Sequence, residues 1–386
     1  KLYLFRDRMG IKPLYYYHDG SDFAFASEIK AINTLGLKKE IDQNSIYAYL
    51  HLGYIPSNKT IYQKLFKVKP GAYLTVEKNQ VQEIGYWNPE SQIQRETMKD
   101  FNTSKSQLRS LLRESVKKRL VSDVPLGTFL SGGTDSSMVT AIAQEVHDSP
   151  INTFSIGFKE GKYNESEHAR KVAGHLGTNH HEFILSERDA LNELENIMDH
   201  FDEPYADSSA LPTMLVSRMA RKHVTVCLSG DGGDELFMGY GAYQWAARLN
   251  HPLWGNLRYP ISKILSRSTN NKYKRAALVF NSPKSNWKSH IFSQEQYLFS
   301  EAEITHLLLD SNGDSMINDL NKDLELKRKL IPSENQALFD LNNYLIDDLL
   351  AKVDRSSMYC SLEGRVPLLD HRLVEFALNL DPKLKM

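Results

Sequence analysis

A turn with two adjacent glycines, set between an apolar run and a helix-forming run, limits what this chain can fold into more than any other feature. Residues 131–137 read Ser-Gly-Gly-Thr-Asp-Ser-Ser, and the residues on both sides are mostly apolar. Gly132 and Gly133 can adopt backbone angles that other residues avoid, so backbone N–H groups can approach a ligand closely. The serines add hydroxyl donors at a helix start. The segment therefore predicts a strand, a phosphate-binding turn and a helix.

The residues of this turn indicate which phosphate chemistry it serves. A Walker-type loop carries a lysine directly after its last glycine, and the lack of one here argues against transfer of a terminal phosphate. Asp135 would repel a phosphate unless a divalent cation lay between them, so we interpret it as a Mg²⁺ ligand near a released pyrophosphate. The simpler alternative is an ordinary strand-to-helix turn with Asp135 as the helix cap.

A second glycine turn carries acids instead of hydroxyls. Residues 229–235 read Ser-Gly-Asp-Gly-Gly-Asp-Glu and follow an apolar run. Such a loop binds phosphate only with a bridging metal, so Asp234 is the second candidate Mg²⁺ ligand. Asp231 and Glu235 would orient the metal, water or a reacting carboxylate. The simpler alternative is a solvated acidic turn.

From residue 107 onward, strand and helix patterns alternate along the chain. We expect strands at 127–130, 152–158, 181–185 and 224–228, and helices at 135–145, 166–176, 187–200 and 211–222. Alternation of this kind predicts an α/β fold, a parallel sheet with helices on both faces and ligands at the carboxyl ends of the strands. Both glycine turns follow strands at that edge. Residues 240–340 are expected to be mostly helical.

The first part of the chain has a different pattern, and this predicts at least two domains. Residues 1–90 are rich in short strands, with hairpin turns at Asp19-Gly20 and Lys78-Asn79. A polar stretch at 89–106 is expected to be a linker. The domains are therefore expected at 1–90 and 107–386, with 91–106 between them.

Composition excludes several classes of function. The net charge of the 386 residues is -1, which gives no excess for binding nucleic acid. The sequence contains no run of about 18 apolar residues, so it predicts no membrane span. We expect a cytoplasmic enzyme. The two cysteines, Cys227 and Cys360, are expected to be reduced packing residues. The histidines clustered in sequence, His168, His175, His180 and His181, lack a metal-binding spacing.

A further polar segment lies at residues 345–358. As a helix it places Asp348, Lys352 and Arg355 on one face. The simpler alternative is a solvated salt-bridge ladder. Acids and serines at 202–209 precede a helix and are interpreted as its cap.

These motifs together resemble a known family. The first turn is similar to the pyrophosphate-binding loop of the N-type ATP pyrophosphatases, the PP-loop superfamily. Both turns, together with residues 362–370 (Leu-Glu-Gly-Arg-Val-Pro-Leu-Leu-Asp), resemble glutamine-hydrolysing asparagine synthetase. Residues 6–16 and 25–31 are similar to the second half of that family's glutaminase domain, which has an N-terminal-nucleophile fold. The likeness extends over nearly the whole chain.

The resemblance implies roles for individual residues. Lys352 would stabilise the pentacovalent phosphate, Asp348 would hold the substrate amine, and Asp231 would act with them as a catalytic residue. Ile156 would lie close to the adenine, although plain core packing is an equal alternative. Glu363 and Arg365 would form a buried structural pair. The candidate ATP- and pyrophosphate-binding residues are Leu130, Ser131, Gly132, Gly133, Asp135, Ser136, Ser137, Ile156, Ser229 and Gly230.

The resemblance also implies that both ends of the chain are cut. Glutaminases of this family use an N-terminal cysteine, whereas this chain begins Lys-Leu-Tyr-Leu-Phe, in mid-strand by its alternation. We therefore expect a glutaminase remnant whose nucleophile is missing and which hydrolyses no glutamine. The far end is expected to lack a final segment of the synthetase domain.

The chemistry these parts support is adenylation of a carboxylate by ATP with Mg²⁺, followed by attack of ammonia. The resemblance implies aspartate as acceptor, glutamine or ammonia as nitrogen source, and a tunnel between two sites; a homodimer is left open. Two alternatives remain. One is a relative acting on another carboxylate, such as a β-lactam-forming synthetase or a tailoring amidotransferase, and the other is a catalytically idle nucleotide-binding relative.

Overall fold

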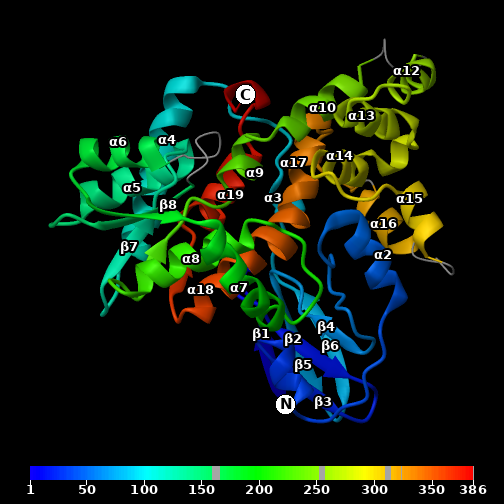
Figure 1. Cartoon of the computed structure of the whole chain (residues 1–386), viewed down its shortest axis with the longest axis horizontal. Coiled ribbons are helices and arrows are strands. Elements are labelled where there is room, and N and C mark those ends of the chain that lie inside the picture. The colour runs from blue at the N-terminus through cyan, green and yellow to red at the C-terminus, as the bar shows by residue number, and fades with distance from the viewer. Residues whose placement is uncertain (159–165, 252–256, 309–313, 323, 386) are drawn as a thin grey trace.

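The computed structural model describes residues 1–158, 166–251, 257–308, 314–322 and 324–385 (Figure 1). The first part of the chain contains β1 (Leu2–Phe5), β2 (Tyr15–His18), β3 (Phe23–Ala26), α1 (Ile29–Asn33), α2 (Gln43–Leu52), β4 (Leu65–Lys67), β5 (Ala72–Glu77), β6 (Gln80–Gly85) and α3 (Pro89–Gln92). The middle part contains α4 (Phe101–Arg119), β7 (Leu126–Phe129), α5 (Thr134–Val146), β8 (Asn152–Phe158), α6 (Ser166–Leu176), β9 (Asn179–Leu185), α7 (Glu187–His200), α8 (Ala210–Arg221), β10 (Val226–Leu228) and α9 (Gly233–Phe237). The last part contains α10 (Gly241–Leu249), α12 (Arg258–Leu265), α13 (Asn271–Asn281), α14 (Trp287–Glu295), α15 (Glu301–Leu307), α16 (Asp314–Asn321), α17 (Pro332–Asn342), a π-helical segment (Leu345–Leu350), α18 (Ala351–Tyr359), β11 (Glu363–Arg365) and α19 (His371–Leu378).

The elements form three regions in space. The blue N-terminal strands lie at the bottom of Figure 1, and a sheet with its flanking helices lies at the left. Helices α10 and α12 to α16 lie at the right, and α17 runs between the regions. The described part of the chain contains no helix long and apolar enough to cross a membrane.

The five-stranded sheet is parallel throughout and has the order β11-β10-β7-β8-β9. The chain goes from β7 to β8 and β9 on one side, and later adds β10 and β11 on the other. A reversal of this kind leaves a crevice at the carboxyl ends of the two strands where it occurs, β7 and β10. Thr128 in β7 lies opposite Leu228 in β10, so the two following loops begin side by side. The expected α/β fold with a parallel sheet is confirmed.

Both faces of this sheet are buried, which explains the continuous apolar character of its strands. Val226 and Leu228 point into a core with α4 and α5, whereas Cys227 between them points into a second core that includes Ala220. Successive residues of a strand face opposite sides, so one short strand serves both layers. Cys227 and Cys360 are free thiols, as expected.

The first part of the chain forms two small antiparallel sheets with the orders β1-β5-β6 and β3-β2-β4. Both expected hairpins are present, and Lys78 and Asn79 adopt positive φ angles of 50° and 60° between β5 and β6. Such angles at two central residues suit the twist of a tight hairpin. Leu4, Val68 and Leu74 form the core shared by the two sheets.

The structure differs from the sequence-based expectations at three places. The stretch 89–106 includes α3 and the start of α4, because Asn88 and Asp100 cap these helices through their side chains. Residues 363–365 form an edge strand that the sequence pattern did not predict. Glu363 and Arg365 pair at 2.7 Å, but their side chains are 45% and 22% exposed, so the pair is not buried as expected.

Asp370 ties the last helix to the core of the sheet region. Its carboxylate caps α19, accepts hydrogen bonds from the Arg372 side chain at 3.0 and 3.1 Å, and pairs with Arg119 at 3.4 Å. Burial opposes ionisation, but the Arg372 hydrogen bonds and the Arg119 charge lower the pKa of Asp370 to about 2. The ionised carboxylate is therefore a stabilising group.

We predict that Asp370→Asn lowers the stability of the protein at pH 7 by about 2–3 kcal/mol, because it removes the charge that two arginines share. The folded pKa lies below the value of about 4 in unfolded chains, so this stability is present above pH 4 and lost as the pH falls toward 2. Urea unfolding of both proteins between pH 7 and pH 3 measures the difference. A difference that stays constant over this range would contradict the prediction.

Candidate functional site

The first glycine turn connects β7 to α5 at the central crevice. Gly132 has a φ of 85°, and a Cβ atom there would lie 2.6 Å from the backbone nitrogen of Ala169 in α6. Only glycine tolerates both this angle and this approach. Gly133 forms the N-cap of α5, and no side chain caps the helix. The alternative in which Asp135 is the helix cap is therefore wrong.

Hydroxyl groups line this turn. The Ser131 and Ser136 hydroxyl oxygens lie 3.0 Å apart, and the Gly133 N–H donates to the Ser131 hydroxyl at 3.3 Å. The buried Ser137 hydroxyl has no hydrogen-bond partner among the described residues. A buried hydroxyl without a partner is costly unless a ligand satisfies it. Together with the free N–H groups of the first turn of α5, these hydroxyls suit an anion.

The second glycine turn connects β10 to α9 and touches the first. A Cβ atom on Gly230 would lie 2.7 Å from the backbone nitrogen of Ser136, and one on Gly233 would collide with the Asp135 carboxylate. Gly232 has a φ of 91° and packs on Leu369, so the segment after β11 supports this turn from below. The two turns are thus in direct contact, which requires the absence of side chains at these glycines.

This contact brings carboxylates together. Burial, followed by the charges of Asp234 and Asp231, raises the pKa of Asp135 to about 6. Burial and Asp231 raise the pKa of Asp234 as well. Three like charges at these contacting turns repel one another unless a cation lies among them. The donor set is oxygen only, which fits Mg²⁺ held by Asp135 and Asp234.

A cavity of about 780 Å³ opens beside the first turn. Its volume lies within the range of roughly 300–1,000 Å³ that is typical of small-molecule sites. Leu130, Ser131 and Ile156 line it, and the opposite wall comes from the start of α8 with Ser209 and Pro212. Ile156 is only partly buried in the protein alone. Its position favours contact with a ligand over plain core packing.

Lys352 contacts Ser209, one of the residues that line this cavity. Its ammonium group donates to Asp207 and to the Ser209 hydroxyl, both at 2.7 Å, and Ser209 lines the cavity. Asp348, Lys352 and Arg355 are all buried, so the alternative of a solvated salt-bridge ladder is wrong. Arg355 does not join the other two, because it pairs with Glu28 of the N-terminal part at 3.3 Å.

Asp348 lies deeper than Lys352. The Tyr205 hydroxyl donates to its carboxylate and, at 3.0 Å, to its backbone oxygen. Burial, with a contribution from the charge of Asp207, raises the pKa of Asp348 to about 7. Asp207 thus pairs with Lys352 and also acts on Asp348, whose carboxylate accepts the hydrogen bond from Tyr205.

Glu235 connects the acidic turn with this buried group. Tyr240 donates to one of its oxygens at 2.9 Å, and the other oxygen has no hydrogen-bond partner in the described part of the chain. Burial raises the pKa of Glu235 to about 7. Tyr240 packs edge-on against Tyr344, whose pKa is raised by burial and then by Asp348 and Asp207. Glu235 is therefore linked through Tyr240 to Tyr344.

Residues 202–209 were interpreted as a helix cap, and this is wrong for most of them. Asp207 holds Lys352, and Tyr205 holds Asp348. Asp202 accepts from the Ile29 N–H at 2.8 Å, and Glu203 accepts from the Ile61 N–H at 2.7 Å, so both contact the N-terminal part. The density of polar residues in this segment was the only sequence signal.

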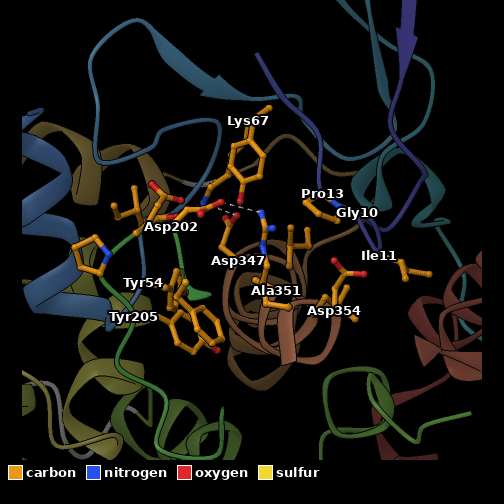
Figure 2. Close-up of a pocket in the computed structure, with 18 of the residues that line it drawn as sticks. Gly10, Ile11, Pro13, Tyr54, Lys67, Asp202, Tyr205, Asp347, Ala351 and Asp354 are labelled. Carbon is orange, nitrogen blue, oxygen red and sulfur yellow. Dashed lines mark hydrogen bonds and ion pairs between the residues drawn. The ribbon is translucent and has the colours of Figure 1, made fainter. Parts of the chain in front are cut away.

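A second cavity lies between the N-terminal part and the helix that carries Lys352 (Figure 2). Tyr54 and Lys67 come from the N-terminal part and Tyr205, Asp347 and Ala351 from the later part, and Figure 2 shows Tyr54 next to Tyr205. Lys67 pairs with Asp347 at 3.1 Å, and both are nearly fully buried. Tyr205 lines this cavity and also contacts Asp348.

Comparison with known proteins now gives the affiliation of the chain. Residues 107–386 match the family described as asparagine synthase. The chain belongs to this family. Residues 1–87 match the family described as glutamine amidotransferase domain. Both findings confirm the resemblance inferred from the sequence.

Individual relatives agree with this assignment. A Methanocaldococcus jannaschii protein named for glutamine-hydrolysing asparagine synthetase is 36% identical over 92% of this chain and 68% of its own length. Asparagine synthetase 1 of Bacillus subtilis is 32% identical over 100% of this chain and 60% of its own length. A Gibberella zeae protein named amidase chry2 is 25% identical over 99% of this chain and 61% of its own length. The chain thus spans 60 to 68% of the length of these relatives.

We predict that Gly132→Ala abolishes the binding of Mg²⁺-ATP and destabilises the protein, because its Cβ would force α6 away from the turn. Isothermal titration calorimetry and thermal unfolding measure the two effects. Gly174→Ala in α6 is the matched control, since a Cβ there meets no atom within 4 Å. The control should bind as the wild type does, and unchanged binding by Gly132→Ala would contradict the prediction.

Proposed function

We propose that the whole protein catalyses the ATP-dependent amidation of L-aspartate to L-asparagine, with nitrogen from glutamine or ammonia. Residues 107–386 would form the synthetase domain and residues 1–90 the amidotransferase portion, joined through 91–106. The observation that carries the proposal is the contact between the two glycine turns at the crevice of the parallel sheet. It places anion-binding N–H groups and hydroxyls next to three acids.

The first step is adenylation. An oxygen of the aspartate β-carboxylate attacks the α-phosphorus of ATP, the bond from this phosphorus to the bridging oxygen breaks, and pyrophosphate leaves. The N–H groups and serine hydroxyls of residues 131–137 would hold the pyrophosphate. Asp135 and Asp234 would hold Mg²⁺, which would neutralise charge on this group. The adenine would lie in the cavity beside Ile156.

The buried cluster would serve the reacting carboxylate. Lys352 would stabilise charge on the α-phosphate, because it is buried and Asp207 and Ser209 hold its ammonium group in place. Asp348 would hold the ammonium group of aspartate, and Asp231 and Glu235 would orient the acceptor. Exclusion of water would protect the aspartyl adenylate until ammonia attacks its carbonyl carbon, AMP leaves and the amide loses a proton.

The cavity in Figure 2 is the proposed route of ammonia between the two parts. In its wall Lys67 pairs with Asp347 and Arg355 with Asp202, and apolar groups of Ile11, Ile346 and Leu350 also line it. Such a lining favours neutral ammonia over ammonium, because unpaired charges would be needed to hold the ion. Tyr205 stands at the boundary with the synthetase cluster.

We predict that Asp135→Asn lowers aspartate-dependent exchange of pyrophosphate into ATP on the order of 100-fold, because a neutral amide cannot hold the cation beside the leaving group. The exchange assay needs no nitrogen donor. Asp148→Asn, just beyond the far end of α5, is the matched control and should keep the wild-type rate. Full exchange by Asp135→Asn would remove this residue from the site.

A second candidate, amidation of a different carboxylate, is favoured by the relative that is named an amidase. The same exchange assay with a panel of carboxylic acids separates the candidates. Fast exchange with aspartate alone supports the first proposal, and fast exchange with another acid alone supports the second. If no acid of the panel supports exchange of pyrophosphate into ATP, both candidates are contradicted.

We predict that Ala351→Phe, which fills the cavity between the two parts, lowers glutamine-dependent amide formation in the whole protein by tenfold or more. Ammonia that reaches the synthetase site from solvent bypasses this route. The rate with ammonium chloride should therefore stay close to the wild-type rate, and it serves as the control for folding. Equal losses with both nitrogen sources would refute the proposed route.

A further inference from the structure

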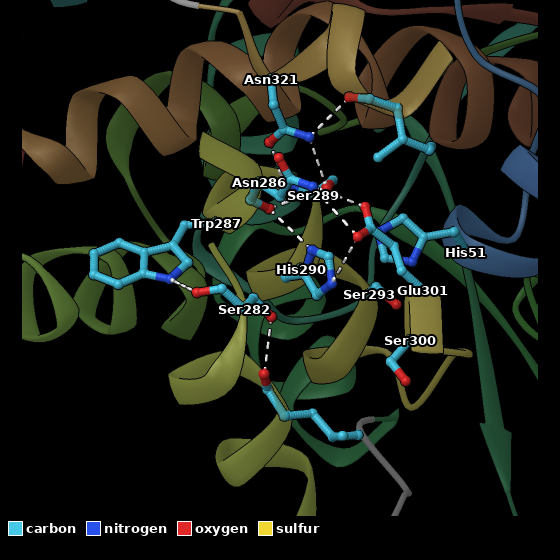
Figure 3. A network of polar contacts seen from close by, with 12 residues as sticks. His51, Ser282, Asn286, Trp287, Ser289, His290, Ser293, Ser300, Glu301 and Asn321 are labelled. Carbon is cyan, nitrogen blue, oxygen red and sulfur yellow. Dashed lines mark hydrogen bonds and ion pairs between the residues drawn. The ribbon is translucent and has the colours of Figure 1, made fainter. Parts of the chain in front are cut away.

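Three side chains meet where α2, α14 and α15 lie close together, at the right of Figure 1. Figure 3 shows them from close by. His51 belongs to the last turn of α2, His290 to α14 and Glu301 to the start of α15. One candidate ligand atom from each lies within 4.8 Å of the other two. Figure 3 shows the two imidazole rings and the carboxylate converging on one point. None of these residues belongs to the proposed synthetase site.

Hydrogen bonds fix the tautomers of the two histidines. The Nδ1 atom of His51 lies 2.9 Å from the carbonyl oxygen of Phe299, and the Nδ1 atom of His290 lies 3.1 Å from that of Asn286. A carbonyl oxygen can only accept a hydrogen bond, so each Nδ1 must carry the proton. In the neutral rings each Nε2 atom therefore presents a lone pair. This is the arrangement found in metal-binding histidines, whose second nitrogen donates to a backbone carbonyl.

The atoms that these three side chains turn toward one another, the two Nε2 atoms and the carboxylate oxygens, are all hydrogen-bond acceptors. His51 is 0% exposed and His290 is 3% exposed, and the Nε2 atom of His51 has no hydrogen-bond partner in the described residues. The Nε2 atom of His290 lies 3.9 Å from a Glu301 oxygen, which is too far for a hydrogen bond. Two lone pairs thus face a carboxylate.

The surroundings orient these three groups. Asn286 uses its carbonyl oxygen for His290 and its side-chain amide for Glu301, at 3.0 and 3.3 Å. Neighbouring polar groups are tied to one another, since Asn321 donates to the Ser289 hydroxyl at 2.8 Å. A metal site requires such outer contacts to hold its ligands in place. Two histidines that only fill space in a core do not require such contacts.

We propose that His51, His290 and Glu301 bind a divalent transition-metal ion, of which Zn²⁺ is the best fit. Two imidazoles and one carboxylate form a common zinc ligand set, with water or another group in the fourth position. Ligand atoms in such a site lie about 3.3 Å apart, so modest side-chain rotation closes the cluster. The Glu301 side chain is 24% exposed.

The ion would join two parts of the chain. His51 lies within the residues that match the glutamine amidotransferase domain, whereas His290 and Glu301 lie within those that match asparagine synthase. Next to the cluster, Tyr47 and Leu52 of α2 already share a hydrophobic core with Phe292 of α14. The metal would therefore act as a structural clamp between the amidotransferase-like part and the helices beyond the synthetase sheet.

We test this with Zn²⁺ itself. The protein is stripped of metal with a chelator and titrated with Zn²⁺ against a chromogenic competitor, and Co²⁺ absorption then reports the coordination. We expect one ion per chain, a tetrahedral Co²⁺ spectrum and a higher Tm with Zn²⁺ present. The absence of saturable binding at micromolar Zn²⁺ would overturn the proposal and leave a buried water as the shared partner.

Variants of the ligands make the test specific. Glu301→Gln keeps an acceptor for Asn286 but loses the charge, and His290→Gln removes one imidazole. Both should weaken Zn²⁺ binding at least tenfold and abolish the Zn²⁺-dependent rise in Tm. His306→Gln, exposed on the same helix as Glu301, should bind as the wild type does. Wild-type binding by both ligand variants would also overturn the proposal, and the Tm without metal shows whether each variant folds.

Discussion

The close approach of two glycine turns is the constraint on which the rest of this molecule depends. The backbone of one turn lies against that of the other, with Gly230 on Ser136, and any side chain there would separate them. The contact also holds acidic groups near one another, so it costs electrostatic energy in the free protein. Strand β11 and Leu369 hold the second turn in place against this repulsion. A bound cation would convert the same repulsion into affinity.

The helix after the π-helical segment couples this site to the N-terminal part. Lys352 and Arg355 are three positions apart, yet they serve different partners. Lys352 is held by Asp207 and Ser209, and Arg355 is held by Glu28 and Asp202. Because both are buried, a shift of this helix would break charged pairs at both ends at once. The structure therefore gives the two parts a rigid connection, which the buried Lys67–Asp347 pair reinforces.

Local patterns in the sequence predicted most of the sheet region, and long-range pairs explain what they missed. Strand β8 and helices α6 and α7 were predicted at their observed bounds, because apolar periodicity and turn residues act over a few positions. The edge strand β11 is too short to show a period. Nothing in the sequence pairs Lys352 with Asp207, or His51 with His290, since these contacts arise only from tertiary packing. The candidate loops were found because glycine and acid spacing is itself local.

The charge balance around Lys352 explains why a buried lysine can serve an anionic ligand. Burial raises the pKa of both Glu235 and Asp348 to about 7, so these acids do not fully compensate the lysine at neutral pH. Burial also opposes the ionisation of Asp207, but the Lys352 ammonium outweighs it and lowers the pKa of Asp207. Asp207 is thus the one acid firmly charged beside Lys352, and the Ser209 hydroxyl is its neutral partner. A phosphate that replaced this hydroxyl would gain a charge-assisted hydrogen bond without breaking the ion pair.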